Sequence, residues 1–148
     1  MIMRLETVEK GLVERLKAAS PKQQRSAVRV ACELAFQAVP VDMPLVVDAL
    51  EQLRRGEKFT SGQISALEGL AAKLDDQYFD LQDRLDDEQG LDVDALQLFS
   101  QARAVSALSL AGGEDSLMSA AEAIYEASSA VDDGAGIFEA VLLVLSEP

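Results

Sequence analysis

Histidine and tryptophan are absent from this 148-residue chain, and cysteine occurs once. Without histidine the chain lacks the commonest general base and metal ligand, and one cysteine can form neither an internal disulfide nor a thiolate metal cage. The apolar run at residues 137–145 is interrupted by Glu139 and is too short to span a bilayer. Residues 1–11 carry charges where a signal peptide has its apolar segment. We therefore expect a cytoplasmic protein that is not an enzyme, binds no metal or other cofactor and does not insert into a membrane.

Basic side chains are also scarce. Thirteen Lys and Arg stand against 26 Asp and Glu, which gives a net charge of -13. Nucleic acids and anionic membranes would be repelled by such a chain, because binding to phosphate requires cations. Hydrophobic residues make up 49% of the sequence, and the length suits one domain with a core of its own. These numbers predict one globular domain over residues 1–148, monomeric when free, with neither nucleic acid nor membrane as partner.

Apolar residues recur at helical spacing along the chain, and strand-like alternation never persists. The fold class predicted is therefore all-α, a bundle of about seven helices. The predicted helices cover residues 5–16, 21–39, 44–55, 61–87, 93 or 95 to 111, 115–131 and 137–145. The second and fifth are apolar over most of their circumference, so we expect both at the centre, with Cys32 as a buried core residue.

Capping signals define several of these boundaries. Ser20 and Gln23 have the spacing of a capping box, and Thr60 and Gln63 repeat it. Asp42, close before a proline, is expected to open the third helix.

The two halves of the chain match at an offset of 74 residues, without a gap. This pairs the second, third and fourth helices with the fifth, sixth and seventh, and is consistent with a duplicated three-helix unit and a pseudo-symmetric bundle. Identical pairs include Gln23/Gln97, Ser26/Ser100, Arg29/Arg103, Leu34/Leu108, Ala49/Ala123, Gly62/Gly136 and Ala66/Ala140.

The negative charge is concentrated in one part of the chain. Residues 1–58 have a net charge of +2, whereas residues 59–148 have a net charge of -15. Nine carboxylates fall within residues 75–94, where Arg84 is the single base. Such self-repulsion lowers stability, which suggests that the charge serves a purpose.

The helix at 61–87 separates its apolar and acidic residues when projected at about 100° per residue. Its core face comprises Leu67, Leu70, Ala71, Leu74, Tyr78, Leu81 and Leu85. A ladder of four aspartates lies opposite this face: Asp76, Asp80, Asp83 and Asp87. Phe79 projects between the core face and the ladder. Together with the acidic residues that follow, the ladder and Phe79 form the candidate partner-binding set: Asp76, Phe79, Asp80, Asp83, Asp86, Asp87 and Glu88.

Two interpretations of this surface are open. An aromatic ring beside carboxylates suits an interface anchor for a basic protein partner. Alternatively, the ladder is an ordinary solvated helix face, and a neighbouring helix covers Phe79. A metal site or a catalytic carboxylate pair is disfavoured, because there is no EF-hand pattern and the ladder faces water instead of lining an enclosed pocket.

Several segments resemble small all-helical bacterial immunity proteins. The residues that carry this resemblance are Ser20-Pro21-Lys22-Gln23-Gln24, Ala31-Cys32-Glu33-Leu34-Ala35, Val39-Pro40, Ala49-Leu50-x-x-Leu53-Arg54-x-Gly56, Asp75-x-x-Tyr78, Ala102-Arg103-Ala104-x-Ser106-Ala107-Leu108 and Ala121-x-Ala123-x-Tyr125-x-Ala127. The resemblance implies a protein that neutralises a polymorphic or secreted toxin by stoichiometric binding.

Our leading hypothesis from the sequence is therefore an immunity protein that sterically inhibits a basic toxin enzyme acting on nucleic acid or nucleotides. The alternative is a non-inhibitory helical scaffold or chaperone-like adaptor.

Overall fold

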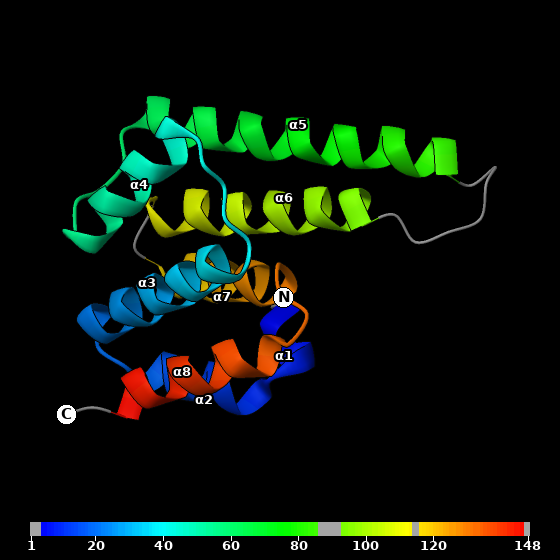
Figure 1. Ribbon diagram of the computed structural model, residues 1–148. Helices are drawn as coiled ribbons and strands as arrows, with labels where there is room; N and C mark the ends of the chain where they lie inside the picture. The colour runs from blue at the N-terminus through cyan, green and yellow to red at the C-terminus, as the bar shows by residue number, and fades with distance from the viewer. Residues whose placement is uncertain (1–3, 86–92, 114–115, 147–148) are drawn as a thin grey trace.

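The computed structural model describes residues 4–85, 93–113 and 116–146, and over these ranges the chain is all-helical (Figure 1). The eight helices within the described residues are α1 (Arg4–Val8), α2 (Lys10–Ala18), α3 (Pro21–Ala38), α4 (Pro44–Arg54), α5 (Ser61–Leu85), α6 (Val93–Ala111), α7 (Leu117–Ser129) and α8 (Gly134–Ser146). The predicted all-α class is confirmed. No helix in the described part of the chain is both long and apolar enough to cross a membrane.

Both predicted capping boxes are present. Ser20 Oγ accepts a 3.2 Å hydrogen bond from the Gln23 backbone N–H, and the Gln23 side chain accepts one of 3.1 Å from the Ser20 N–H. Thr60 and Gln63 form the same pair of bonds at 3.1 and 2.9 Å. These interactions satisfy backbone donors within four residues of the chain, so α3 and α5 begin where local sequence dictates.

The prediction that Asp42 caps α4 is wrong, since the cap position is Met43, which offers no side-chain hydrogen bond. Met43 has an extended conformation, with φ -124° and ψ 137°. A proline disfavours helical geometry in the residue before it. Pro44 is therefore the first residue of the helix, and Asp42 lies one position too early to cap it.

The predicted first helix is two helices, which raises the total from about seven to eight among the described residues. Glu9 leaves helical geometry, with φ -152° and ψ 80°, between α1 and α2. Gly11, a weak helix former, follows closely. The break allows Leu5 on α1 and Leu12 on α2 both to be fully buried, whereas Val8, which the sequence pattern placed with them, is exposed.

The last helix begins three residues earlier than predicted, at Gly134 instead of 137. The Asp133 carboxylate accepts a 3.2 Å hydrogen bond from the Ala135 backbone N–H. This bond satisfies a free donor of the first helical turn, which extends α8 into the predicted loop.

The helices are arranged in layers, with other helices packed on two sides of α6 (Figure 1). α5 lies along one side of α6, and α7 and α3 lie on the other side, with α8 and α2 beyond them. The predicted central positions of α3 and α6 are confirmed by their packing against helices on both sides. α7 is equally central, because it contacts α1, α2, α3, α6 and α8. The paired ends of α5 and α6 project beyond the rest of the bundle.

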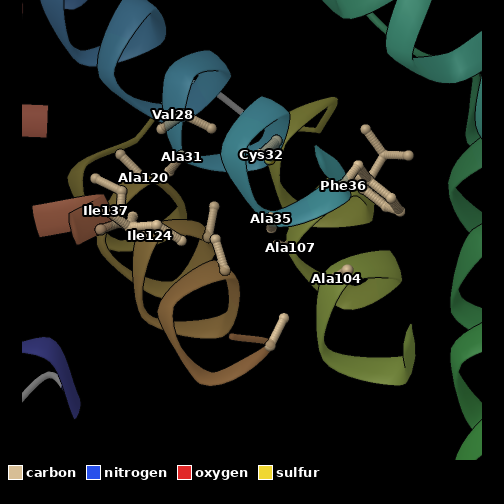
Figure 2. Packing of buried hydrophobic residues seen from close by; sticks show 14 of the residues in the cluster. Val28, Ala31, Cys32, Ala35, Phe36, Ala104, Ala107, Ala120, Ile124 and Ile137 are labelled. Atoms are coloured by element: carbon tan, nitrogen blue, oxygen red, sulfur yellow. The ribbon is translucent and has the colours of Figure 1, made fainter. Parts of the chain in front are cut away.

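Small side chains line the contact between the central helices (Figure 2). Ala35 of α3 lies near Ala107 of α6, and Ala31 of α3 lies near Ala120 of α7; all four are buried. Side chains this short allow two helices to approach closely, which sets the spacing of the central layer. Cys32 is fully buried in the same cluster, as predicted, and burial, with a smaller contribution from the charge on Glu33, raises the pKa of its thiol to about 12.

Candidate protein-binding surface

The described part of the aspartate ladder faces solvent. Asp76, Asp80 and Asp83 of α5 are all exposed, and none forms a hydrogen bond or ion pair with another described residue. Their spacing of three to four residues places them along one side of the helix. Asp86, Asp87 and Glu88, predicted to belong to the same surface, lie outside the described residues.

Phe79 is also uncovered, with 59% of its surface exposed. The interpretation in which a neighbouring helix shields this ring is therefore wrong. Its ring meets the edge of Tyr78, with ring centroids 5.3 Å apart and planes at 61°. Tyr78, on the predicted core face, is half-buried. The two neighbouring rings therefore extend from the interior of the paired α5 and α6, here called the α5–α6 hairpin, to its surface.

α6 contributes two further apolar side chains at this end of the molecule. Tyr78 contacts Phe99 across the α5–α6 interface, with ring centroids 5.5 Å apart. Phe99 is 36% exposed, and Leu96, one turn earlier on α6, is 49% exposed. We call Tyr78, Phe79, Leu96 and Phe99 the aromatic cluster, and the cluster with Asp76, Asp80 and Asp83 the aromatic–acidic surface.

Leu96 and Phe99 are not recognisable as surface residues from periodicity alone, because both belong to the apolar pattern of the fifth predicted helix. Their positions nevertheless contain a signal. Leu96, Phe99 and Arg103 are three and four residues apart and form a stripe beside the buried stripe of Ala95 and Ala102. A stripe of residues that includes a charged arginine is less suited to complete burial in an apolar core than one without it.

Side-chain contacts hold the aromatic cluster in place. The Gln82 amide donates a 3.3 Å hydrogen bond to the Tyr78 hydroxyl. The Arg103 guanidinium lies 5.6 Å from the centroid of the Phe99 ring, within range of a cation–π interaction. These contacts restrain Tyr78 and Phe99, and side chains that are already restrained lose less entropy when a surface is covered.

Arg103 is itself fixed by a network of ion pairs that joins four helices. It donates hydrogen bonds to Asp75 of α5 at 2.6 Å and to Glu126 of α7 at 3.1 Å. Glu126 is only 4% exposed, and it also accepts a 2.6 Å hydrogen bond from Arg4 of α1. Arg4 further contacts Glu122, and these carboxylates, Glu122 foremost, raise the pKa of its guanidinium. The network anchors the projecting α5–α6 hairpin to α7 and α1.

The described carboxylates of this surface do not form a metal site. Within the described residues, no group of three or more Asp, Glu, Cys or His side chains has the arrangement needed to hold a metal ion. The described ladder carboxylates are spread along an open helix face instead of converging on a point. This surface thus combines exposed apolar rings with aspartates that no described residue neutralises.

Comparison with known proteins returned no family model, no curated protein and no solved structure that matches this chain.

Proposed function

We propose that this protein is a cytoplasmic, non-enzymatic immunity protein that binds a basic bacterial toxin enzyme through the aromatic–acidic surface and blocks its active site. The observation that carries the proposal is the exposed Phe79 ring, fixed by Tyr78 and lying beside aspartates that no described residue neutralises. Exposed aromatic side chains are unfavourable in water, and an interface that covers them gains that free energy back.

The two components of the surface have different roles in this mechanism. Phe79 and Phe99 would enter an apolar recess on the toxin and supply most of the binding free energy, as central aromatic residues do in other interfaces. Asp76, Asp80 and Asp83 would attract the basic partner over distances of roughly a Debye length, about 8–10 Å at ordinary salt, and so accelerate association.

The negative charge of this surface supports one class of toxin activity in this proposal. An enzyme that cleaves nucleic acid or modifies nucleotides has a cationic cleft that binds phosphate groups. Carboxylates on a projecting helical hairpin can occupy such a cleft and exclude the substrate sterically. No catalytic step by the immunity protein is needed.

A growth experiment tests the proposal. The toxin candidate encoded beside this gene is expressed in cells with and without the present protein, and survival is counted. We expect survival only when both are present, and loss of protection when Phe79→Ala is combined with Asp→Asn changes at Asp76, Asp80 and Asp83. Leu143→Ala is the matched control, because Leu143 is 71% exposed on α8, away from the hairpin.

Other outcomes would overturn the proposal. A stable complex without protection would indicate the scaffold or adaptor function instead. Sedimentation that shows a dimer, abolished by Phe79→Ala, would indicate that the aromatic cluster joins two copies of this chain, against our proposal that the free protein is a monomer.

We also propose that α3–α5 and α6–α8 are copies of one three-helix unit. Shifted by 74 residues, α6, α7 and α8 fall on 19–37, 43–55 and 60–72, close to the starts of α3, α4 and α5. In each unit the third helix packs on the first helix of the other, α5 on α6 and α8 on α3. Superposition of the two units in an experimental structure tests this: another offset that fits equally well would contradict it.

A further inference from the structure

A second candidate site lies at the other end of α6. A cleft of about 610 Å³ opens between the first half of α3, the connection from α4 to α5, and the described residues at the end of α6 and the start of α7. This volume is in the usual range of small-molecule sites, about 300–1,000 Å³. On α6, Phe99 of the aromatic cluster and Leu110 of the cleft lining lie about 16 Å apart along the helix axis, at the usual rise per residue. The two sites are therefore separate.

Among its described residues, the lining of this cleft has more cations than carboxylates, in contrast to the rest of the protein. Four of the thirteen Lys and Arg residues contribute to it, namely Lys22, Arg25, Arg29 and Lys58. Among the described residues of the lining, Glu57 is the one carboxylate, and it forms a 2.7 Å ion pair with Arg55 outside the cleft. Glu57 therefore forms no described ion pair with the cations of the cleft.

Arg29 is the most informative of these cations. It is half-buried, yet it forms no ion pair or hydrogen bond with another described residue. Its counterpart 74 residues later, Arg103, is bonded to Asp75 and Glu126. A guanidinium without a partner among the described residues can bind an anion in the cleft. Because Arg25 and Lys58 have interactions of their own, we base the proposal on Arg29 and Lys22.

The remaining lining favours an anion with an apolar part. Ser26 and Ser119 supply hydroxyl groups, and Leu53, Leu110 and Leu117 supply apolar surface. The first turn of α7 borders the cleft, and the positive end of its helix dipole adds to the attraction for an anion.

We propose that this cleft binds a small organic phosphate, with the phosphate group at Arg29 and Lys22 and the apolar part against the three leucines. The site is independent of the proposed immunity function, since it shares no residue with the aromatic–acidic surface.

Phenyl phosphate is the probe, because it joins one phosphate to one apolar ring. Calorimetric titration of the full chain should give one site, with a Kd on the order of 1 mM or tighter, the affinity range of fragment-sized ligands. Benzyl alcohol, which has the ring and no phosphate, should bind at least tenfold more weakly. Amide NMR shifts should localise phenyl phosphate to Gly56, Gly112 and Ser119, which border the cleft.

Variants test the assigned residues. Arg29→Gln should weaken binding at least tenfold, and Lys22→Gln, at an exposed position, should weaken it severalfold without affecting the fold. Lys17→Gln on α2 removes the same charge from an exposed position outside the cleft and should leave Kd unchanged. Three results would each overturn the proposal. They are a lack of saturable binding at a phenyl phosphate concentration of about 10 mM, equal weakening of binding by all three variants, and NMR shifts confined to residues outside the cleft.

Discussion

The Phe59 ring lies directly against the backbone of Gly112. The Phe59 N–H donates a 3.1 Å hydrogen bond to the Gly112 carbonyl oxygen, and a Cβ added to Gly112 would come within 1.8 Å of the ring. This contact joins the α4–α5 connection to the end of α6, and so fixes two of the three segments that border the basic cleft.

Gly112→Ala should therefore lower the free energy of unfolding by about 1–3 kcal/mol or more, because the buried Phe59 ring must move to accommodate the methyl group. Urea denaturation followed by circular dichroism measures the change. Gly113→Ala is the control, since its added Cβ would meet its nearest neighbour at an ordinary 3.6 Å. Equal stability of the two variants would show that the Phe59 contact is not tight.

The ion-pair network leads to a second prediction. Glu126→Gln removes the nearly buried carboxylate that Arg103 and Arg4 share, so we expect a loss of about 2–4 kcal/mol in unfolding free energy. Glu122→Gln removes a partner of the half-exposed Arg4 alone and should cost less than about 1 kcal/mol. Chemical denaturation of both variants gives the comparison, and the reverse order would contradict the role of Glu126 at the centre of the network.

Stability should depend on Cys32 at alkaline pH. The thiol pKa is raised to about 12 in the folded protein from an ordinary value of 9.0, so the unfolded chain loses this proton first. The contribution of the thiol is complete below pH 9 and falls as pH rises from 9 towards 12, by up to about 1.4 kcal/mol per pH unit. Cys32→Ala lacks this dependence. The stability difference between the two proteins, measured at pH 8 and pH 10, should shrink or change sign at the higher pH. A difference independent of pH would show that Cys32 is accessible to solvent.

The aromatic–acidic surface gives a kinetic prediction for the cognate toxin. Replacing Asp76, Asp80 and Asp83 by Asn should slow association and reduce its dependence on salt, with the unfolding midpoint unchanged or slightly raised as repulsion is relieved. Phe79→Ala should instead speed dissociation and weaken binding by about 2 kcal/mol or more. Stopped-flow or surface-based kinetics at two salt concentrations separates these effects.

A matched control removes equal charge elsewhere. Asp42→Asn, Asp48→Asn and Glu139→Gln together neutralise three exposed carboxylates outside the aromatic–acidic surface. If this variant slows association as much as the ladder variant does, net charge and not the ladder steers the encounter. A destabilised Phe79→Ala protein would reassign that ring to the core.

Local signals in the sequence were sufficient for much of the fold. The capping boxes at Ser20 and Thr60 were predictable because each consists of hydrogen bonds between residues three apart. The core face of α5 was predictable for a related reason: helical periodicity brings Leu67, Ala71 and Leu74 to one side of the helix wherever it packs. The same periodicity placed Asp76 and Asp80 in solvent.

Tertiary structure determined the exposure and ion pairing of side chains, because these depend on which helices pack against one another. Leu96 and Phe99 carry the same apolar signal as Ala102, yet they are exposed because α6 extends past the helices that cover its remainder. Arg29 and Arg103 match at the 74-residue offset, but among the described residues Arg103 bonds to carboxylates of other helices and Arg29 does not. A sequence pattern specifies which faces of a helix are apolar or charged, whereas exposure and ion pairing depend on neighbours distant in the chain, and these are determined only when the helices pack.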